Sequence, residues 1–365
     1  QHDIKAVSIK RECVENQWEE LGSKEPIFSR YHKLEEPSQG IDKIALDTTQ
    51  GRLTEATLLL EETSPTYLAL SQKGELFSVT SVDGEGGTAA YQPEMDHFNL
   101  LNKVTEEGAP PCYVAVDENR QLVYAANYHQ GIVHVYRILK DGSLEDADKV
   151  IHTEPTGPHE NQNNAHVHYT DLTPDQRLVV CDLGTDRVYT YNVSLDGKLS
   201  EIAQFVTEPG TGPRHLVFHP TKSLAYLFGE LDSTVSVLSY DETDGSFTEL
   251  QKVSTLPADY DAFNGGAAIR ISSDGRFLYA SNRGHNSIAV YAVSENGEAI
   301  ERIQLISTEG DIPRDFDLDP SEDFIVVANQ DSDNLTLYRR NQETGLLEMI
   351  QKDVAVPECV CVLFV

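Results

Sequence analysis

The chain of 365 residues is long enough for two ordinary domains or for one large β architecture. Charged residues make up 24% of it and hydrophobic residues 39%, which is a globular rather than a disordered composition. A formal net charge of −32 repels phosphate backbones and argues against nucleic acid as a partner. A small anionic ligand is not excluded, because salt screens distant charges from a local basic pocket.

The sequence contains five cysteines, an odd number without regular spacing, which argues against a disulfide framework. It shows neither a signal peptide nor an apolar run of about 18 residues that would cross a membrane. We therefore expect a soluble, cytoplasmic protein that does not bind membranes. A monomer and a homodimer both remain open.

Short alternating strands, separated by turns, recur in a fixed order along the chain. One unit has a first strand after Pro111, a second that ends at Asn127, a third after Gly131 and then a fourth apolar stretch. The units start at Pro65, Pro111, Val167, Pro213, Gly266, Pro313 and Pro357. Four short strands in each unit of about 40–50 residues predict an all-β propeller with four-stranded antiparallel blades. No amphipathic helix suggests a parallel βαβ fold.

The last unit contains only its first strand, which follows Pro357. The region before Pro65 supplies the missing strands, which we place at residues 28–32, 40–46 and 53–60. Six complete units and one split unit predict a seven-bladed β-propeller whose last blade is closed by N- and C-terminal strands, which protects the strand edges. We assign residues 26–365 to the propeller and residues 1–25 to an N-terminal extension of unknown role.

The repeat register predicts which residues share one mouth of the central channel. Because strand two returns antiparallel beside strand one, the first residue of strand one lies next to the end of strand two. The charged residues and the histidine at these two positions are His168, Arg214, Glu230, Arg283, Arg314 and Glu358. Tyr128 occupies the same position, and Asn127 and Asn282 lie one residue earlier in their units.

Polar residues at a channel rim are often simply solvated, and asparagine at the end of a strand often caps a turn. Three arginines that face one small space, however, repel one another unless an anion or carboxylates lie between them. We therefore predict an anion-binding site at this mouth, where loops of several blades meet.

Other motifs point to no further chemistry. His166 and His168 share one strand, whereas His159 lies on a loop, so we predict no metal site. The glycine-rich segment 83–87 is followed by no helix, and we interpret it as a hairpin turn rather than a phosphate loop. The chain has no Gly-x-Ser-x-Gly motif, so a serine nucleophile is not supported.

Five short motifs, each in its proper blade, resemble those of the propeller lactonase family, which includes bacterial 6-phosphogluconolactonases and fungal carboxy-cis,cis-muconate cyclases. These motifs are His166-Val-His168, Gly212-Pro-Arg214-His215, Gly229-Glu230-Leu231, Ser281-Asn282-Arg283-Gly284 and Pro313-Arg314-Asp315-Phe316. The resemblance spans residues 28–365 and implies a catalytic set of His168, Arg214, Glu230 and Arg283. We add Arg314, Asn127, Tyr128, Asn282 and His166 as predicted substrate-binding residues.

Two departures from the family pattern fall in the closing blade. The strand before Ser38-Gln-Gly-Ile does not read Gly-Thr-Tyr-Thr, and Cys359 stands where the family usually has glycine. These departures concern the packing of that blade more than the predicted site.

The resemblance implies a 6-phosphogluconolactonase of the pentose phosphate pathway, which hydrolyses a small anionic sugar lactone without metal or cofactor. Arg214 or Arg283 would stabilise the oxyanion, and Arg314 would hold the phosphate. Glu230 or His168 would take the proton from water. Two alternatives stay open. One is a muconate-type lactonising enzyme or a hydrolase of carboxylated lactones, and the other is a non-catalytic propeller that binds a protein partner.

Overall fold

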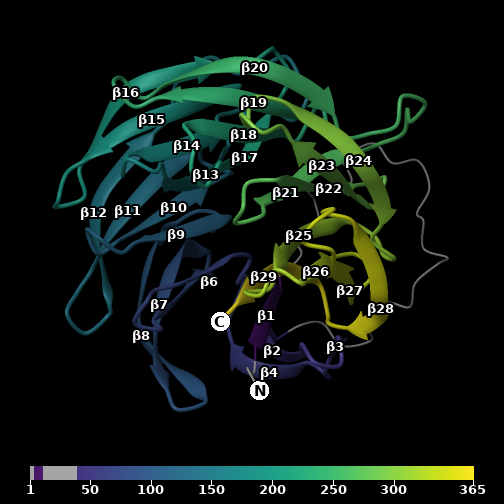
Figure 1. The fold of residues 1–365 in the computed structure, drawn as a ribbon. Coiled ribbons are helices and arrows are strands. Elements are labelled where there is room, and N and C mark those ends of the chain that lie inside the picture. The colour runs from purple at the N-terminus through teal and green to yellow at the C-terminus, as the bar shows by residue number, and fades with distance from the viewer. Residues whose placement is uncertain (1–3, 11–38) are drawn as a thin grey trace.

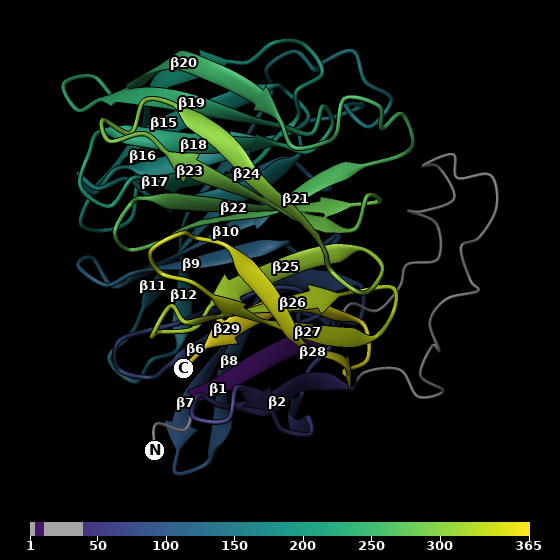
Figure 2. The same ribbon diagram turned by 45° about the vertical axis from the view of Figure 1, so that its right-hand side comes forward.

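The computed structural model describes residues 4–10 and 39–365 of the chain. In these ranges the regular elements are all strands, which form seven antiparallel sheets arranged as a ring (Figures 1 and 2). The predicted seven-bladed β-propeller is therefore confirmed. The described part of the chain offers no helix of the length and apolar character needed to span a membrane.

Six blades are each built from four consecutive strands. Blades 1 and 2 contain β5 (Leu68–Leu70), β6 (Leu76–Val82), β7 (Glu85–Glu94), β8 (His97–Glu107), β9 (Tyr113–Asp117), β10 (Leu122–Asn127), β11 (Ile132–Ile138) and β12 (Leu144–Ile151). Blades 3 and 4 contain β13 (Val167–Leu172), β14 (Leu178–Asp182), β15 (Arg187–Val193), β16 (Leu199–Val206), β17 (Pro213–Phe218), β18 (Leu224–Gly229), β19 (Thr234–Asp241) and β20 (Ser246–Ser254). Blades 5 and 6 contain β21 (Gly265–Ile271), β22 (Phe277–Arg283), β23 (Ser287–Val293), β24 (Ile300–Ser307), β25 (Pro313–Leu318), β26 (Phe324–Asn329), β27 (Asn334–Arg340) and β28 (Leu347–Ala355).

The seventh blade joins the two ends of the chain. It contains β29 (Cys359–Phe364), β1 (Ile4–Lys10), β2 (Gly40–Asp47), β3 (Arg52–Leu53) and β4 (Thr57–Glu61). Strand β1 lies antiparallel between β29 and β2, with Ala6 opposite Phe364 (Figure 1).

Closure by N- and C-terminal strands is therefore confirmed, and the predicted strands at 40–46 and 53–60 match β2 and the pair β3 and β4, but our placement of the strand beside β29 was wrong. The position beside β29 that we gave to residues 28–32 is occupied by β1, which falls within the segment 1–25 that we expected to fit no blade. The β-branched residues Ile4, Val7 and Ile9 favour a strand there. Residues 28–32 lie outside the described residues, as does most of the segment 1–25.

Strand one carries a β-bulge at the channel mouth in blades 3, 4 and 6. The extra, unpaired residues are His168 in β13, Arg214 in β17 and Arg314 in β25. Simple alternation would send successive side chains to opposite faces of a sheet. A bulge re-aims a side chain, so that His168 and Tyr169, or Arg214 and His215, both face the channel.

Side-chain amides connect the outer strands of neighbouring blades. In each pair the amide accepts from a backbone N–H and donates to the carbonyl of the same residue. The pairs are Gln251 with Ile300, Gln304 with Leu347, and Gln351 with Leu53. The Gln351–Leu53 bonds, of 2.7 and 3.2 Å, join blade 6 to the closing blade. The closing blade is therefore attached to its neighbour by the same kind of contact that connects the complete blades.

Inside the channel, an aromatic layer lies beyond the mouth and a charged layer lies beyond that. The aromatic layer is formed by Tyr67, Tyr113, Tyr169 and His215, with ring centroids 4.3–6.3 Å apart. In the charged layer, Arg270 Nη2 donates to Asp315 Oδ1 at 3.0 Å, and its Nε lies 3.4 Å from Asp317 Oδ1.

Burial raises the pKa of Asp315 and raises that of Asp317 to about 6, while Arg270 opposes both shifts. A carboxyl group with a raised folded-state pKa stabilises the fold at low pH, and this contribution is lost as the pH rises through that pKa.

We predict that Arg270→Met destabilises the protein by about 3–5 kcal/mol at pH 8, because it leaves two buried carboxylates uncompensated. The loss should be smaller at pH 5, where both carboxyl groups gain protons in the folded variant. Urea unfolding at the two pH values measures the difference. Exposed Arg276, substituted by Met, serves as the control, and an equal loss at both pH values would contradict the charge argument.

Candidate functional site

The channel mouth contains an arginine–glutamate cluster built around one carboxylate oxygen. Glu230 Oε1 accepts a hydrogen bond from Arg283 Nη2 at 2.6 Å and lies 3.2 Å from Arg214 Nε. Arg283 Nη2 also donates to the carbonyl of Gly266 at 2.9 Å. The cluster therefore joins blade 4, which supplies Arg214 and Glu230, to blade 5, which supplies Arg283.

Gly265 and Gly266 allow Arg283 to reach this position. A Cβ atom at Gly266 would lie 2.5 Å from the ring of Phe228 and 2.8 Å from the carbonyl oxygen of Gly229. A Cβ atom at Gly265 would lie 3.2 Å from Arg283 Nη2. A side chain at either position would disturb the packing that holds the Arg283 guanidinium against the backbone.

Arg214 is only 2% exposed, yet its Nη1 has no hydrogen-bond partner among the described residues. Its Nε contact with Glu230 is an ion pair whose N–H is poorly aligned for a hydrogen bond. Burial and the nearby Arg283 lower the pKa of Arg214 to about 10, against the opposing effect of Glu230. The guanidinium therefore remains charged at neutral pH, and an anionic ligand would relieve its unsatisfied donor.

His168 lies beside these arginines and is 7% exposed, and its Nδ1 has no partner among the described residues. Burial, Arg214 and Arg314 hold the pKa of His168 well below its usual value of 6.5. The imidazole is therefore neutral at pH 7 and is able to accept a proton.

Cys112 also lies at this mouth, where its thiol points to the carbonyl oxygens of Val167 and His168. Burial raises the pKa of the Cys112 thiol to about 11, although Arg214 and Arg314 oppose the shift. The protonated thiol is a poor nucleophile at neutral pH.

Tyr128 and His166 form one wall of the mouth. Their rings stack at 4.2 Å, and the Tyr128 ring lies 5.8 Å from that of His168. Both ring nitrogens of His166 have partners, the carbonyl of Tyr128 at 2.6 Å and Asn163 Oδ1 at 2.9 Å. His166 thus supports the wall and has no free ring nitrogen for a ligand.

Asn127 and Asn282, which we predicted to bind the substrate, donate to backbone carbonyls and not to the arginine–glutamate cluster. Asn127 Nδ2 donates to the carbonyl of Ala109 at 2.9 Å, and Asn282 Nδ2 donates to that of Thr255 at 3.0 Å. Both side chains are at most 2% exposed. They fix the connections between blades, which is the turn-capping role usual for asparagine at such positions.

The predicted residues that the structure does bring together are His168, Arg214, Glu230, Arg283 and Arg314, with Tyr128 beside them. Sequence reasoning missed His215, although it directly follows Arg214. Strand alternation would turn it away from the channel, and no signal in the sequence marks the bulge that turns it inward.

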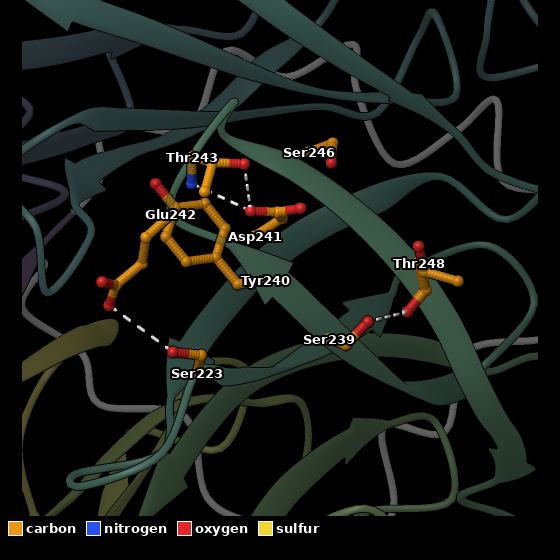
Figure 3. Close-up of a pocket in the computed structure, with 8 residues that line it drawn as sticks. All are labelled: Ser223, Ser239, Tyr240, Asp241, Glu242, Thr243, Ser246 and Thr248. Atoms are coloured by element: carbon orange, nitrogen blue, oxygen red, sulfur yellow. Dashed lines mark hydrogen bonds between the residues drawn. The ribbon is translucent and has the colours of Figure 1, made fainter.

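A hollow on the outside of blade 4 lies away from this cluster (Figure 3). It is lined by Ser223, Ser239, Tyr240, Asp241, Glu242, Thr243, Ser246 and Thr248. Its polar groups largely satisfy one another, as where Thr243 Oγ1 donates to Asp241 Oδ1 at 2.6 Å. Across residues 4–10 and 39–365, no three His, Cys, Asp or Glu side chains converge as a metal-binding group would.

Buried guanidinium groups beside a neutral imidazole define a site for a small anion at which acyl transfer to water is chemically feasible. The family model described as "Lactonase, 7-bladed beta-propeller" matches residues 27–364. The chain therefore belongs to the seven-bladed propeller lactonases.

Relatives and solved structures agree with this assignment. A Bacillus subtilis protein named 6-phosphogluconolactonase is 43% identical over 332 residues, which cover 90% of this chain and 95% of the relative. A crystal structure from Lactobacillus plantarum is 50% identical with a TM-score of 0.91, and the match covers all of both chains. The periplasmic gluconolactonase of Pseudomonas aeruginosa is 26% identical with a TM-score of 0.86 over 99% of each chain.

We predict that Asn282→Ala lowers the free energy of unfolding by about 1–3 kcal/mol, because buried groups of Thr255 lose their partner. Lactone turnover by the folded variant should stay within about threefold of wild type, well below the effect of losing a binding contact. Urea unfolding and steady-state kinetics measure the two quantities. A raised KM with unchanged stability would instead place the Asn282 amide on the substrate.

Proposed function

We propose that this protein is a 6-phosphogluconolactonase, which hydrolyses 6-phospho-D-glucono-1,5-lactone to 6-phosphogluconate. The observation that carries the proposal is the unsatisfied, buried Nη1 of Arg214 beside the neutral imidazole of His168. The name of the B. subtilis relative and the family assignment support the same reaction.

In the proposed mechanism, water attacks the lactone carbonyl and the developing oxyanion is stabilised by Arg214. His168 takes the proton from the attacking water, because its Nδ1 has no partner among the described residues. Glu230 is less suited to that role, since its Oε1 already interacts with both Arg214 and Arg283. Collapse of the tetrahedral intermediate breaks the ring C–O bond, and the departing alkoxide receives the proton from His168.

Arg314 is proposed to bind the phosphate of the substrate, because it lies near His168 and Cys112 at the same mouth. Guanidinium groups bind carboxylates equally well, so a carboxylated lactone is the second candidate substrate. The P. aeruginosa enzyme, whose name specifies gluconolactone without phosphate, makes an unphosphorylated sugar lactone a necessary comparison. We propose a cytoplasmic location on the basis of the phosphorylated substrate.

We expect Arg214→Ala to lower kcat by about 10²–10³-fold, the usual effect of removing one donor to an oxyanion. Hydrolysis of freshly prepared 6-phosphogluconolactone, coupled to 6-phosphogluconate dehydrogenase, measures the rate above the spontaneous reaction. Arg276→Ala is the matched control, because Arg276 is exposed on the turn between β21 and β22, at the far end of these strands. Absence of acceleration by folded wild-type protein would refute the proposed function.

The acid limb of the kcat/KM profile should lie at lower pH than the usual histidine value of 6.5, because burial and two arginines depress the pKa of His168. The enzyme is therefore expected to keep its activity as the pH falls from 7.5 through 6.5. His168→Gln should lower the rate and remove this limb. An acid limb above 6.5, or one that persists in the variant, would exclude His168 as the base.

A further inference from the structure

His215 is a fully enclosed imidazole directly inside the candidate site. It follows Arg214 on the bulged strand β17 and is 3% exposed. Its ring centroid lies 5.3 Å from that of Tyr113, 5.7 Å from that of Tyr169 and 6.3 Å from that of Tyr67. Three blades other than its own therefore enclose it from the inner side of the channel.

Neither ring nitrogen of His215 has a hydrogen-bond partner among the described residues. The neighbouring tyrosines do not supply one. Tyr113 donates its hydroxyl to Asp171 Oδ2 at 3.0 Å, and the Tyr67 hydroxyl interacts with Arg270 in the charged layer further inside. The tyrosine rings contact His215 without a hydrogen bond to it, whereas a buried imidazole needs at least one polar contact.

The fourth ring that lies against His215 is that of His168. The two imidazole rings lie 5.0 Å apart at an angle of 67°, and His168 Nδ1 is also buried without a partner. Burial and Arg214 hold the pKa of His215 well below 6.5, as they do for His168. Two neutral imidazoles with unpartnered ring nitrogens therefore lie side by side, next to the proposed oxyanion donor Arg214.

We propose that His168 and His215 together bind the water molecule that attacks the lactone, with His215 holding it from the inner side of the channel. The water oxygen forms the new bond to the carbonyl carbon, and His168 accepts the released proton. His215 keeps its own proton and orients the water. The catalytic part of this inference depends on the proposed function, whereas the water site itself does not.

A purely structural His215 would act by filling the aromatic layer. Phenylalanine would replace it well in that role, and glutamine poorly, because glutamine leaves a flexible amide among aromatic rings. If His215 binds water, the glutamine variant should be the more active of the two, because an amide can bind water and a phenyl ring cannot. Which of the two variants is the more active therefore distinguishes a structural role of His215 from a water-binding role.

We expect His215→Phe to lower kcat by at least about tenfold with little change in KM, as for loss of an interaction made to the attacking group. Its Tm should be close to that of wild type, since phenylalanine fills the same place in the aromatic layer. His215→Gln should retain more activity than His215→Phe despite a lower Tm. Tyr169→Phe, which changes a neighbouring ring of the same layer, is the control and should keep kcat.

A crystal structure of the wild-type protein tests the water site without any assumption about the substrate. We expect an ordered solvent oxygen within about 3.2 Å of His168 Nδ1 and of one His215 nitrogen. In crystals of His215→Phe that oxygen should be displaced or lost.

The possible outcomes distinguish the two proposals. If wild-type protein hydrolyses no lactone but its crystals contain the bridging solvent, the proposed function fails and the water site stands. If lactone is hydrolysed and His215→Phe retains full kcat, the role of His215 is refuted. Crystals in which both rings bond only to protein groups would refute the site itself.

Discussion

Glu230 Oε1 interacts with two guanidinium groups at once, and the arrangement of the channel mouth depends on this shared oxygen. Without it, Arg214 and Arg283 would repel each other in a space from which water is largely excluded, where charges interact strongly. The surrounding protein carries a net charge of −32. The mouth is thus a locally cationic region inside an acidic molecule, and the Glu230 carboxylate holds Arg214 and Arg283 together while leaving Arg214 Nη1 unsatisfied.

Burial, with the same arginines, determines the protonation of the neighbouring histidines. His168 and His215 are kept neutral by burial together with the positive charge of Arg214. A base with a depressed pKa is weak, but it is present in its unprotonated form over a wide pH range. Sugar lactones hydrolyse readily without an enzyme, so in the proposed reaction a weak base and one oxyanion donor need to supply only a modest reduction of the barrier.

The fold and much of the mouth could be predicted from the sequence, because the repeat register alone places Arg214, Glu230 and Arg283 at adjacent strand ends. The bulges could not be predicted, since nothing in the sequence of β13 or β17 marks the extra residue. For that reason His215 was missed. For Asn282 the register gives the position of the side chain but not the backbone carbonyl to which its amide donates.

The closing blade, in which the two ends of the chain meet, is built like the other blades. The antiparallel pairing of β1 with β29 brings the start of one strand beside the end of the other, as in an ordinary hairpin. The Gln351–Leu53 contact repeats the amide pairs found between uninterrupted blades. The arrangement of the blades therefore depends little on which blade the two ends of the chain close. A circular permutant that joins these two strands by a tight turn and opens between blades 1 and 2 would keep every blade, together with Arg214, Glu230 and Arg283.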